Sequence, residues 1–139
     1  MPKNIIADSS ALIALVRHDD QHHRWLDAHV DSLPMPWHTC EAALSEAFHL
    51  VGERGVPKIK DMLRRGAVVL SFDLGDELEP VLTLMDKYAD VPMSLADACL
   101  VRMSETLSDP VVLTTDADFK IYRRHSRQVV PCLMPGNGS

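Results

Sequence analysis

The stretch NIIADSSALIALV, residues 4–16, indicates the fold class most directly. It opens with a short apolar run over Asn4–Ala7, meets a carboxylate at Asp8 and continues in a helical pattern. This order predicts a buried strand that leads straight into a helix. Asp8 is therefore expected at the carboxyl end of the strand.

The same alternation of strand and helix patterns continues along the chain. Further strands are expected at residues 67–72, 111–114 and 129–133, and helices at residues 20–30, 39–53, 58–65, 74–88, after an N-cap at Ser94, and at 118–124. Parallel strands need crossover connections, so this alternation predicts an α/β fold, a three-layer α/β/α sandwich around a mainly parallel sheet. We expect one domain over residues 1–134 and a disordered tail over 135–139.

Composition sets the broad class. The 139 residues, 46% of them hydrophobic, suit one ordinary globular domain. No apolar stretch approaches the roughly 18 residues of a membrane span, and the start of the chain lacks the apolar region of a signal peptide, so we expect a soluble, cytoplasmic protein without a membrane partner. Cys40, Cys99 and Cys132 lack metal-site spacing and are expected to be reduced and buried.

The net charge of −6 has the wrong sign for a protein that grips nucleic acid by bulk electrostatics. Any such role would need a local basic surface or bound cations.

Two acidic residues lie where a strand pattern stops and a helix pattern starts. Asp8 follows the first strand and Asp116 follows the strand at residues 111–114. Sites in parallel α/β sheets form at the carboxyl ends of the strands, so these carboxylates are expected on one edge.

Glu46 and Asp97 lie at unusual places within helices. The helical neighbours of Glu46 are Ala42, Ala43 and Leu50, which predicts a carboxylate on a buried helix face, a costly position unless it is paired or bound to metal. Asp97 lies one turn into the helix that Ser94 opens, among Met93, Leu100 and Val101. The N-terminus of that helix favours its ionised form.

Four carboxylates without a nearby histidine or cysteine suit a hard cation such as Mg²⁺ or Mn²⁺. Each acid also has a plain structural interpretation. Asp8 and Asp116 could be helix N-caps, Asp97 could complement a helix dipole, and Glu46 could be an ion-paired core residue. The four together are better explained by a site.

At these residues the chain resembles the PIN-domain family, and within it the VapC-type toxins of bacterial toxin–antitoxin pairs. The resemblance runs through IIADSSALIAL, TCEAALSEAFHL, SLADACLV and VLTTDADF, in order along the chain. It implies an endoribonuclease that uses Mg²⁺ or Mn²⁺, acts on RNA, forms a homodimer and is silenced by a cognate antitoxin. Asp8, Glu46, Asp97 and Asp116 match the family's catalytic, metal-holding acidic quartet.

Residues around the quartet are candidates for supporting roles. Ser9 and Thr115 flank the acids and could orient ligands or water. Asp118 is a possible further metal ligand, although an N-cap role for the short helix at 118–124 is the stronger interpretation. Basic residues near the last acidic motif could hold RNA phosphates or be solvated surface: Arg102, Lys120, Arg123 and Arg124.

Other functions compete with this interpretation. A non-catalytic PIN-like RNA-binding or scaffold module would keep the fold, but all four acids are present. A phospho-accepting receiver needs a pair of acids near the first strand, where Asp8 stands alone, and haloacid-type phosphatases need DxD, absent at residues 8–10. A DNA or flap nuclease with the same carboxylates, and a site with one metal ion or two, both stay open.

Overall fold

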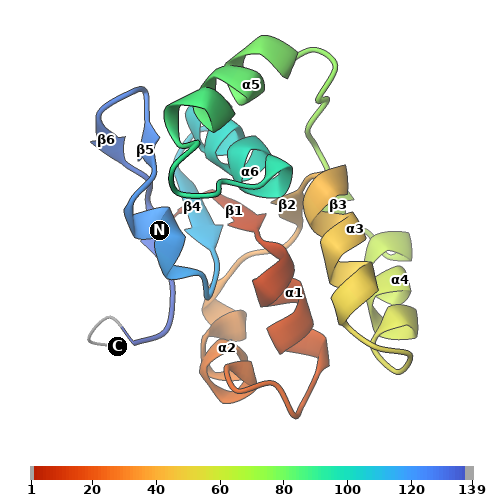
Figure 1. Cartoon of the computed structure of the whole chain (residues 1–139). Coiled ribbons are helices and arrows are strands. Elements are labelled where there is room, and N and C mark those ends of the chain that lie inside the picture. The colour runs from red at the N-terminus through yellow and green to blue at the C-terminus, as the bar shows by residue number, and fades with distance from the viewer. Residues whose placement is uncertain (1, 137–139) are drawn as a thin grey trace.

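The computed structural model describes residues 2–136 and shows strands and helices alternating along the chain (Figure 1). The five strands of the main sheet are all parallel and lie in the order β3-β2-β1-β4-β7. They are β1 (Asn4–Ala7), β2 (Trp37–Thr39), β3 (Val68–Leu70), β4 (Pro110–Leu113) and β7 (Cys132–Leu133). A separate antiparallel hairpin consists of β5 (Arg123–Arg124) and β6 (Gln128–Val129).

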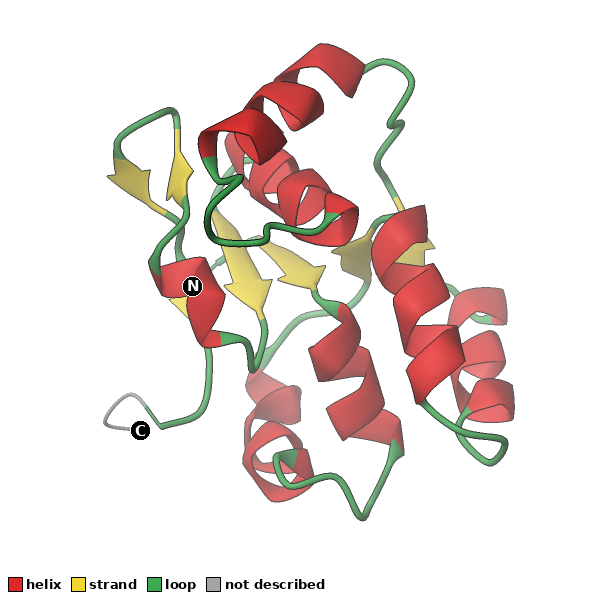
Figure 2. Ribbon diagram, viewed as in Figure 1, coloured by secondary structure: helices red, strands yellow, loops and turns green. Residues whose placement is uncertain are grey.

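Helices connect the strands. They are α1 (Ser9–Val16), α2 (His23–His29), α3 (Glu41–Leu50), α4 (Val56–Arg64), α5 (Leu78–Lys87) and α6 (Leu95–Thr106), with short 3-10 turns at Val30–Ser32 and Ala117–Lys120. Figure 2 shows helices on both sides of the strands. None of the helices in the described residues is long and apolar enough to cross a membrane.

Alternation along β1 divides the core into two parts. Ile5 and Ala7 pack in a cluster with side chains of α1, α2, α3 and α4, whereas Ile6 packs with Val112 and side chains of α5 and α6. Successive side chains of a strand point to opposite faces, so both faces of β1 are covered by helices. The predicted three-layer α/β/α sandwich with a parallel sheet is confirmed.

The centre of the sheet is the place where the chain changes direction. From β1 the chain builds β2 and β3 on one side, then crosses to place β4 on the other side of β1. Ala7 and Leu113, the last residues of β1 and β4, are register partners, and the Asp8 amide donates to the Leu113 carbonyl at 3.0 Å. Ligands of open α/β sheets bind at such switch points.

The structure corrects several element boundaries. The strand β2 lies where a turn and the start of a helix were expected, because three residues carry too little periodic pattern to be recognised. The helix expected at 118–124 is wrong: a 3-10 turn at Ala117–Lys120 is followed by β5. The strand expected at 129–133 is divided, because Pro131 has no amide hydrogen and the chain changes partner from β5 to β4 there.

The cysteines are free, as expected. Cys40 and Cys99 are buried at 2% and 1% exposure, whereas Cys132 is only partly buried. Of the tail predicted to be disordered, residues 137–139 lie outside the described residues.

Candidate active site

Asp8 lies at the junction between β1 and α1, with 4% of its surface exposed. As the N-cap of α1 it accepts the Ser9 amide through Oδ1 at 2.7 Å. Its Oδ2 accepts the hydroxyls of Thr114 at 2.7 Å and Ser10 at 3.2 Å. The Ser9 hydroxyl donates more weakly to Oδ1, at 3.4 Å. The N-cap interpretation of Asp8 is therefore correct, and the buried carboxylate is held by four donors.

The electrostatics of Asp8 show that another acid is close. Burial raises the pKa of Asp8 to about 6, hydrogen bonds led by that from Thr114 oppose the rise, and the charge of Asp97 adds to it. A carboxylate that desolvation and a like charge disfavour is a candidate ligand for a cation, which would remove both penalties.

Asp97 is the third residue of α6 and completes a capping box with Ser94. Its amide donates to Ser94 Oγ at 3.0 Å, and its Oδ2 accepts the Ser94 amide at 3.4 Å. The same oxygen accepts the Tyr122 hydroxyl at 2.9 Å. Burial raises the pKa of Asp97, and the charge of Asp116 adds to the rise. Asp97 is thus electrostatically linked to both strand-end acids.

Asp116 caps the 3-10 turn after β4 by accepting the Asp118 amide at 2.9 Å. Its own amide donates to Thr114 Oγ1 at 3.0 Å. Thr114 therefore joins the backbone of Asp116 to the carboxylate of Asp8. Asp118 is not the N-cap, contrary to the structural interpretation offered for it; it lies in the turn that Asp116 caps.

Glu46 is placed differently from the prediction. It is exposed rather than on the buried face of α3, and its expected neighbour Leu50 is 53% exposed. The buried side chains of α3 are Ala43, Leu44 and Ala47. Glu46 nevertheless reaches the site, since Ser9 Oγ donates to its Oε1 at 2.5 Å.

The four predicted acids are therefore connected but not clustered. Asp8, Asp97 and Asp116 interact through their charges, and Glu46 joins Asp8 through Ser9. Within residues 2–136, no three histidine, cysteine, aspartate or glutamate side chains form a ready-made metal centre. The chemistry of the donors fits a hard divalent cation, because the linked groups are carboxylates and hydroxyls, and a cation would relieve the repulsion between the carboxylates.

Three supporting residues were missed or undervalued in the sequence. Thr114 is fully buried and holds Asp8, Ser10 accepts the Thr115 amide at 3.0 Å as well as contacting Asp8, and Tyr122 holds Asp97. Ser9 contacts the acids as expected, whereas Thr115 contributes its backbone. A hydroxyl beside a strand-end acid, as in the TTD of residues 114–116, was the signal available for Thr114.

The predicted RNA-binding arginines have other partners. Arg102 pairs with Glu77 at 2.8 Å and Glu105 at 3.1 Å. Arg123 and Arg124 donate to backbone carbonyls, those of Lys120 and Ser104 among them. The contact of Arg124 with Ser104 ties the hairpin to α6, and that of Arg102 with Glu77 ties α6 to the residue before α5. An RNA role for these arginines, and for the exposed Lys120, stays a prediction.

Comparisons with known proteins agree on the fold. The family model described as "PIN domain" matches residues 5–124. The crystal structure of the Mycobacterium tuberculosis VapC20, described as a sarcin-ricin loop cleaving toxin, aligns with a TM-score of 0.76 and 20% sequence identity over 85% of this chain and 94% of that chain. The curated proteins include no match to the sequence.

Proposed function

This chain belongs to the PIN-domain family, and on that premise we propose that it is a metal-dependent endoribonuclease that hydrolyses RNA phosphodiester bonds. One observation carries the proposal. A buried carboxylate, Asp8, lies at the switch point of the sheet, where the charge of Asp97 adds to the rise in its pKa. A folded protein keeps such mutually repelling acids when a cation compensates them.

The proposed metal-holding residues are Asp8, Glu46, Asp97 and Asp116, and the proposed ion is Mg²⁺ or Mn²⁺. When bound, the cation would activate water and neutralise the oxyanions of the scissile phosphodiester. Asp118 is a further candidate, because it lies close enough to the other acids to act on the same group. The pKa of Tyr122 is raised first by burial and by the Asp97 hydrogen bond, and then by the charges of Asp97, Asp118 and Asp116.

The remaining site residues would orient these acids. Thr114 and Ser10 donate to one oxygen of Asp8, so they restrict its rotation and favour the ionised form. Ser9 holds Glu46, and Tyr122 holds Asp97. Such hydrogen bonds from neighbouring groups set the orientation of metal-binding carboxylates in proteins.

The biological setting is also a proposal. The similarity in fold to VapC20 supports a toxin of a toxin–antitoxin pair, with RNA as substrate and a cognate antitoxin as partner. A homodimer and a cytoplasmic location stay predictions of the sequence. The particular RNA that VapC20 cleaves is not assigned to this chain, because the two sequences are only 20% identical.

Cleavage of a mixed structured-RNA pool tests the proposal. The purified chain is assayed with Mg²⁺ or Mn²⁺, with EDTA, and as Asp8→Asn, with Asp86→Asn on the exposed face of α5 as matched control. We expect metal-dependent cleavage that leaves 5′-phosphate and 3′-hydroxyl ends and that only Asp8→Asn abolishes. A folded Asp8→Asn that cuts at the parent rate would refute the site. RNA binding without cleavage would favour the non-catalytic module, and cleavage of DNA alone the DNA nuclease.

A further inference from the structure

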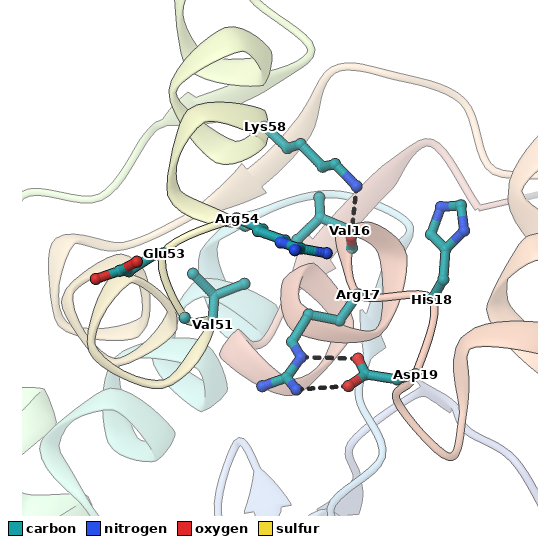
Figure 3. Close-up of a pocket in the computed structure, with 10 residues that line it drawn as sticks. Val16, Arg17, His18, Asp19, Val51, Glu53, Arg54 and Lys58 are labelled. Carbon is teal, nitrogen blue, oxygen red and sulfur yellow. Dashed lines mark hydrogen bonds and ion pairs between the residues drawn. The ribbon is translucent and has the colours of Figure 1, made fainter.

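A cavity lies away from the acids, at the far end of α1. It has a volume of about 660 Å³ and is formed by residues 16–19 at the end of α1, residues 51–55 after α3, and Lys58 of α4. Figure 3 shows Arg54 and Lys58 reaching over it from the α4 side, with Val16, Arg17 and His18 opposite. The proposed nuclease function assigns no role to this cavity.

Two helices connect the cavity to the candidate active site. α1 starts beside Asp8 and ends at Val16, and eight residues of helix span about 12 Å. α3 carries Glu46 and packs beside α1 (Figure 1). The residues that follow α3 line the same cavity. At 3.4 Å per nucleotide of stacked strand, this distance is about three to four nucleotides.

The cavity is lined by more cationic than acidic side chains. Arg17 is paired through two hydrogen bonds with Asp19, at 3.0 and 2.8 Å, so these two charges cancel. Glu53 also lines the cavity, but in Figure 3 its side chain extends away from Arg54 and Lys58. Among the described residues, Arg54 has neither a hydrogen bond nor an ion pair, and Lys58 contacts only the Val16 carbonyl, at 3.2 Å. Two cations thus remain available to an anion.

The imidazole ring of His18 lines the same cavity as these two cations. His18 stacks on His23 with ring centroids 4.5 Å apart and 21° between the ring planes. His23 Nδ1 is in turn hydrogen-bonded to the Ala14 carbonyl at 2.7 Å, which anchors the pair to α1. The exposed His18 lines the cavity and offers a face on which a base can stack.

We propose that this cavity is a second subsite for the RNA substrate, in which Arg54 and Lys58 bind a backbone phosphate and His18 stacks on a neighbouring base. The inference rests on the proposed nuclease function and adds to it a grip on the strand a few nucleotides from the cleaved bond. On a chain with a net charge of −6, such local cations are what allow a polyanion to bind. The subsite would therefore position the substrate and take no part in the chemistry.

Binding in the absence of metal separates this proposal from the chemistry. A fluorescein-labelled short single-stranded RNA is titrated in EDTA with the parent, Arg54→Ala, and the double variant Arg54→Ala/Lys58→Ala. The matched control is Lys60→Ala/Arg64→Ala, which removes two exposed cations of α4 that do not line the cavity. Arg54→Ala removes no hydrogen bond or ion pair of the described residues, so it keeps the test valid if the double variant unfolds.

We expect the cavity double variant to bind several-fold more weakly than the control at low salt. The slope of the log binding constant against log salt concentration should become shallower by about 0.7, because the double variant loses one phosphate contact on a single strand. His18→Ala should weaken binding without changing the slope. Equal affinity of the cavity and control variants for RNA would overturn the proposal. Absence of RNA binding by the parent protein would overturn it as well.

The outcomes also distinguish this subsite from the proposed function. Cavity-dependent RNA binding by a parent protein that cleaves no RNA would support the subsite and refute the nuclease. Metal-dependent cleavage with RNA binding that ignores Arg54 and Lys58 would do the reverse.

Discussion

Thr114 donates its hydroxyl to Oδ2 of Asp8 at 2.7 Å, across 106 residues of sequence. The bond exists because β1 and β4 are parallel neighbours whose last residues, Ala7 and Leu113, are register partners. Each residue that follows its strand therefore meets the other at the same edge. The threonine supplies the strongest of the hydrogen bonds that oppose the rise in the pKa of Asp8.

Thr114→Val should raise the pKa of Asp8 further, because it removes the hydrogen bond that favours the ionised carboxylate. It also leaves the Asp116 amide without its acceptor. We expect RNA cleavage near neutral pH to fall about tenfold and the acidic limb of the pH–rate profile to move to higher pH. Thr83→Val, on an exposed position of α5, is the control. An unshifted profile would show that Thr114 does not govern this ionisation.

The metal-free protein should lose stability as pH rises from about 4 to 6. The pKa of Asp8 is about 6 in the folded state and 3.8 without the fold, so the folded state binds the proton more tightly. The contribution is complete below about pH 4, disappears as pH passes 6, and amounts to about 3 kcal/mol. Asp97, whose pKa is also raised, acts in the same direction.

Urea unfolding in EDTA from pH 4 to 7 measures this dependence. Asp8→Asn removes the titrating group, so its free energy of unfolding should vary less with pH and exceed that of the parent at pH 7. A variant that follows the parent at every pH would contradict the assignment of the raised pKa to Asp8.

Mn²⁺ should stabilise the parent at pH 7, because it would bind the folded arrangement of acids and relieve their repulsion. Saturation at 100 times the dissociation constant contributes about 2.7 kcal/mol, which corresponds to a rise in melting temperature of roughly 5–10 °C. Asp97→Asn should lose most of the rise, and Asp86→Asn should retain it. Differential scanning fluorimetry with a Mn²⁺ titration provides the comparison, and equal rises in all three proteins would place the ion elsewhere.

The substitution Tyr122→Phe should show whether Tyr122 acts by orienting Asp97 or only by packing its ring in the core. The ring lies edge-on to Tyr88 and Phe119 at 5.2 Å, and phenylalanine keeps both contacts. Loss of the hydroxyl should cost about 1 kcal/mol of stability and raise the pKa of Asp97, which that hydrogen bond lowers. We expect kcat to fall more than KM changes, measured on a short RNA. If the variant has the same kcat as the parent, Tyr122 contributes to packing and does not orient Asp97 for catalysis.

Local patterns in the sequence predicted most of the elements, though not β2 or the β5–β6 hairpin, and the places of three acids. These places follow from short-range features: the apolar run before Asp8, the strand that precedes Asp116 and the cap at Ser94 that precedes Asp97. Each feature can be recognised from the spacing of residue types within a few positions. The same spacing misled at Glu46, since small side chains on α3 resembled a buried stripe that the packing leaves partly exposed.

Only the tertiary structure decided which groups meet. The pairing of β1 with β4 brings Thr114 to Asp8, the packing of α1 against α3 brings Ser9 to Glu46, and the turn after β4 brings Tyr122 to Asp97. Interactions between residues close in sequence produce a periodic pattern of apolar and polar residues. Contacts between distant residues depend instead on the register of the strands and the packing of whole helices, which no local pattern encodes. The sequence by itself therefore predicted the candidate residues for the chemistry, and the fold decided how they are held.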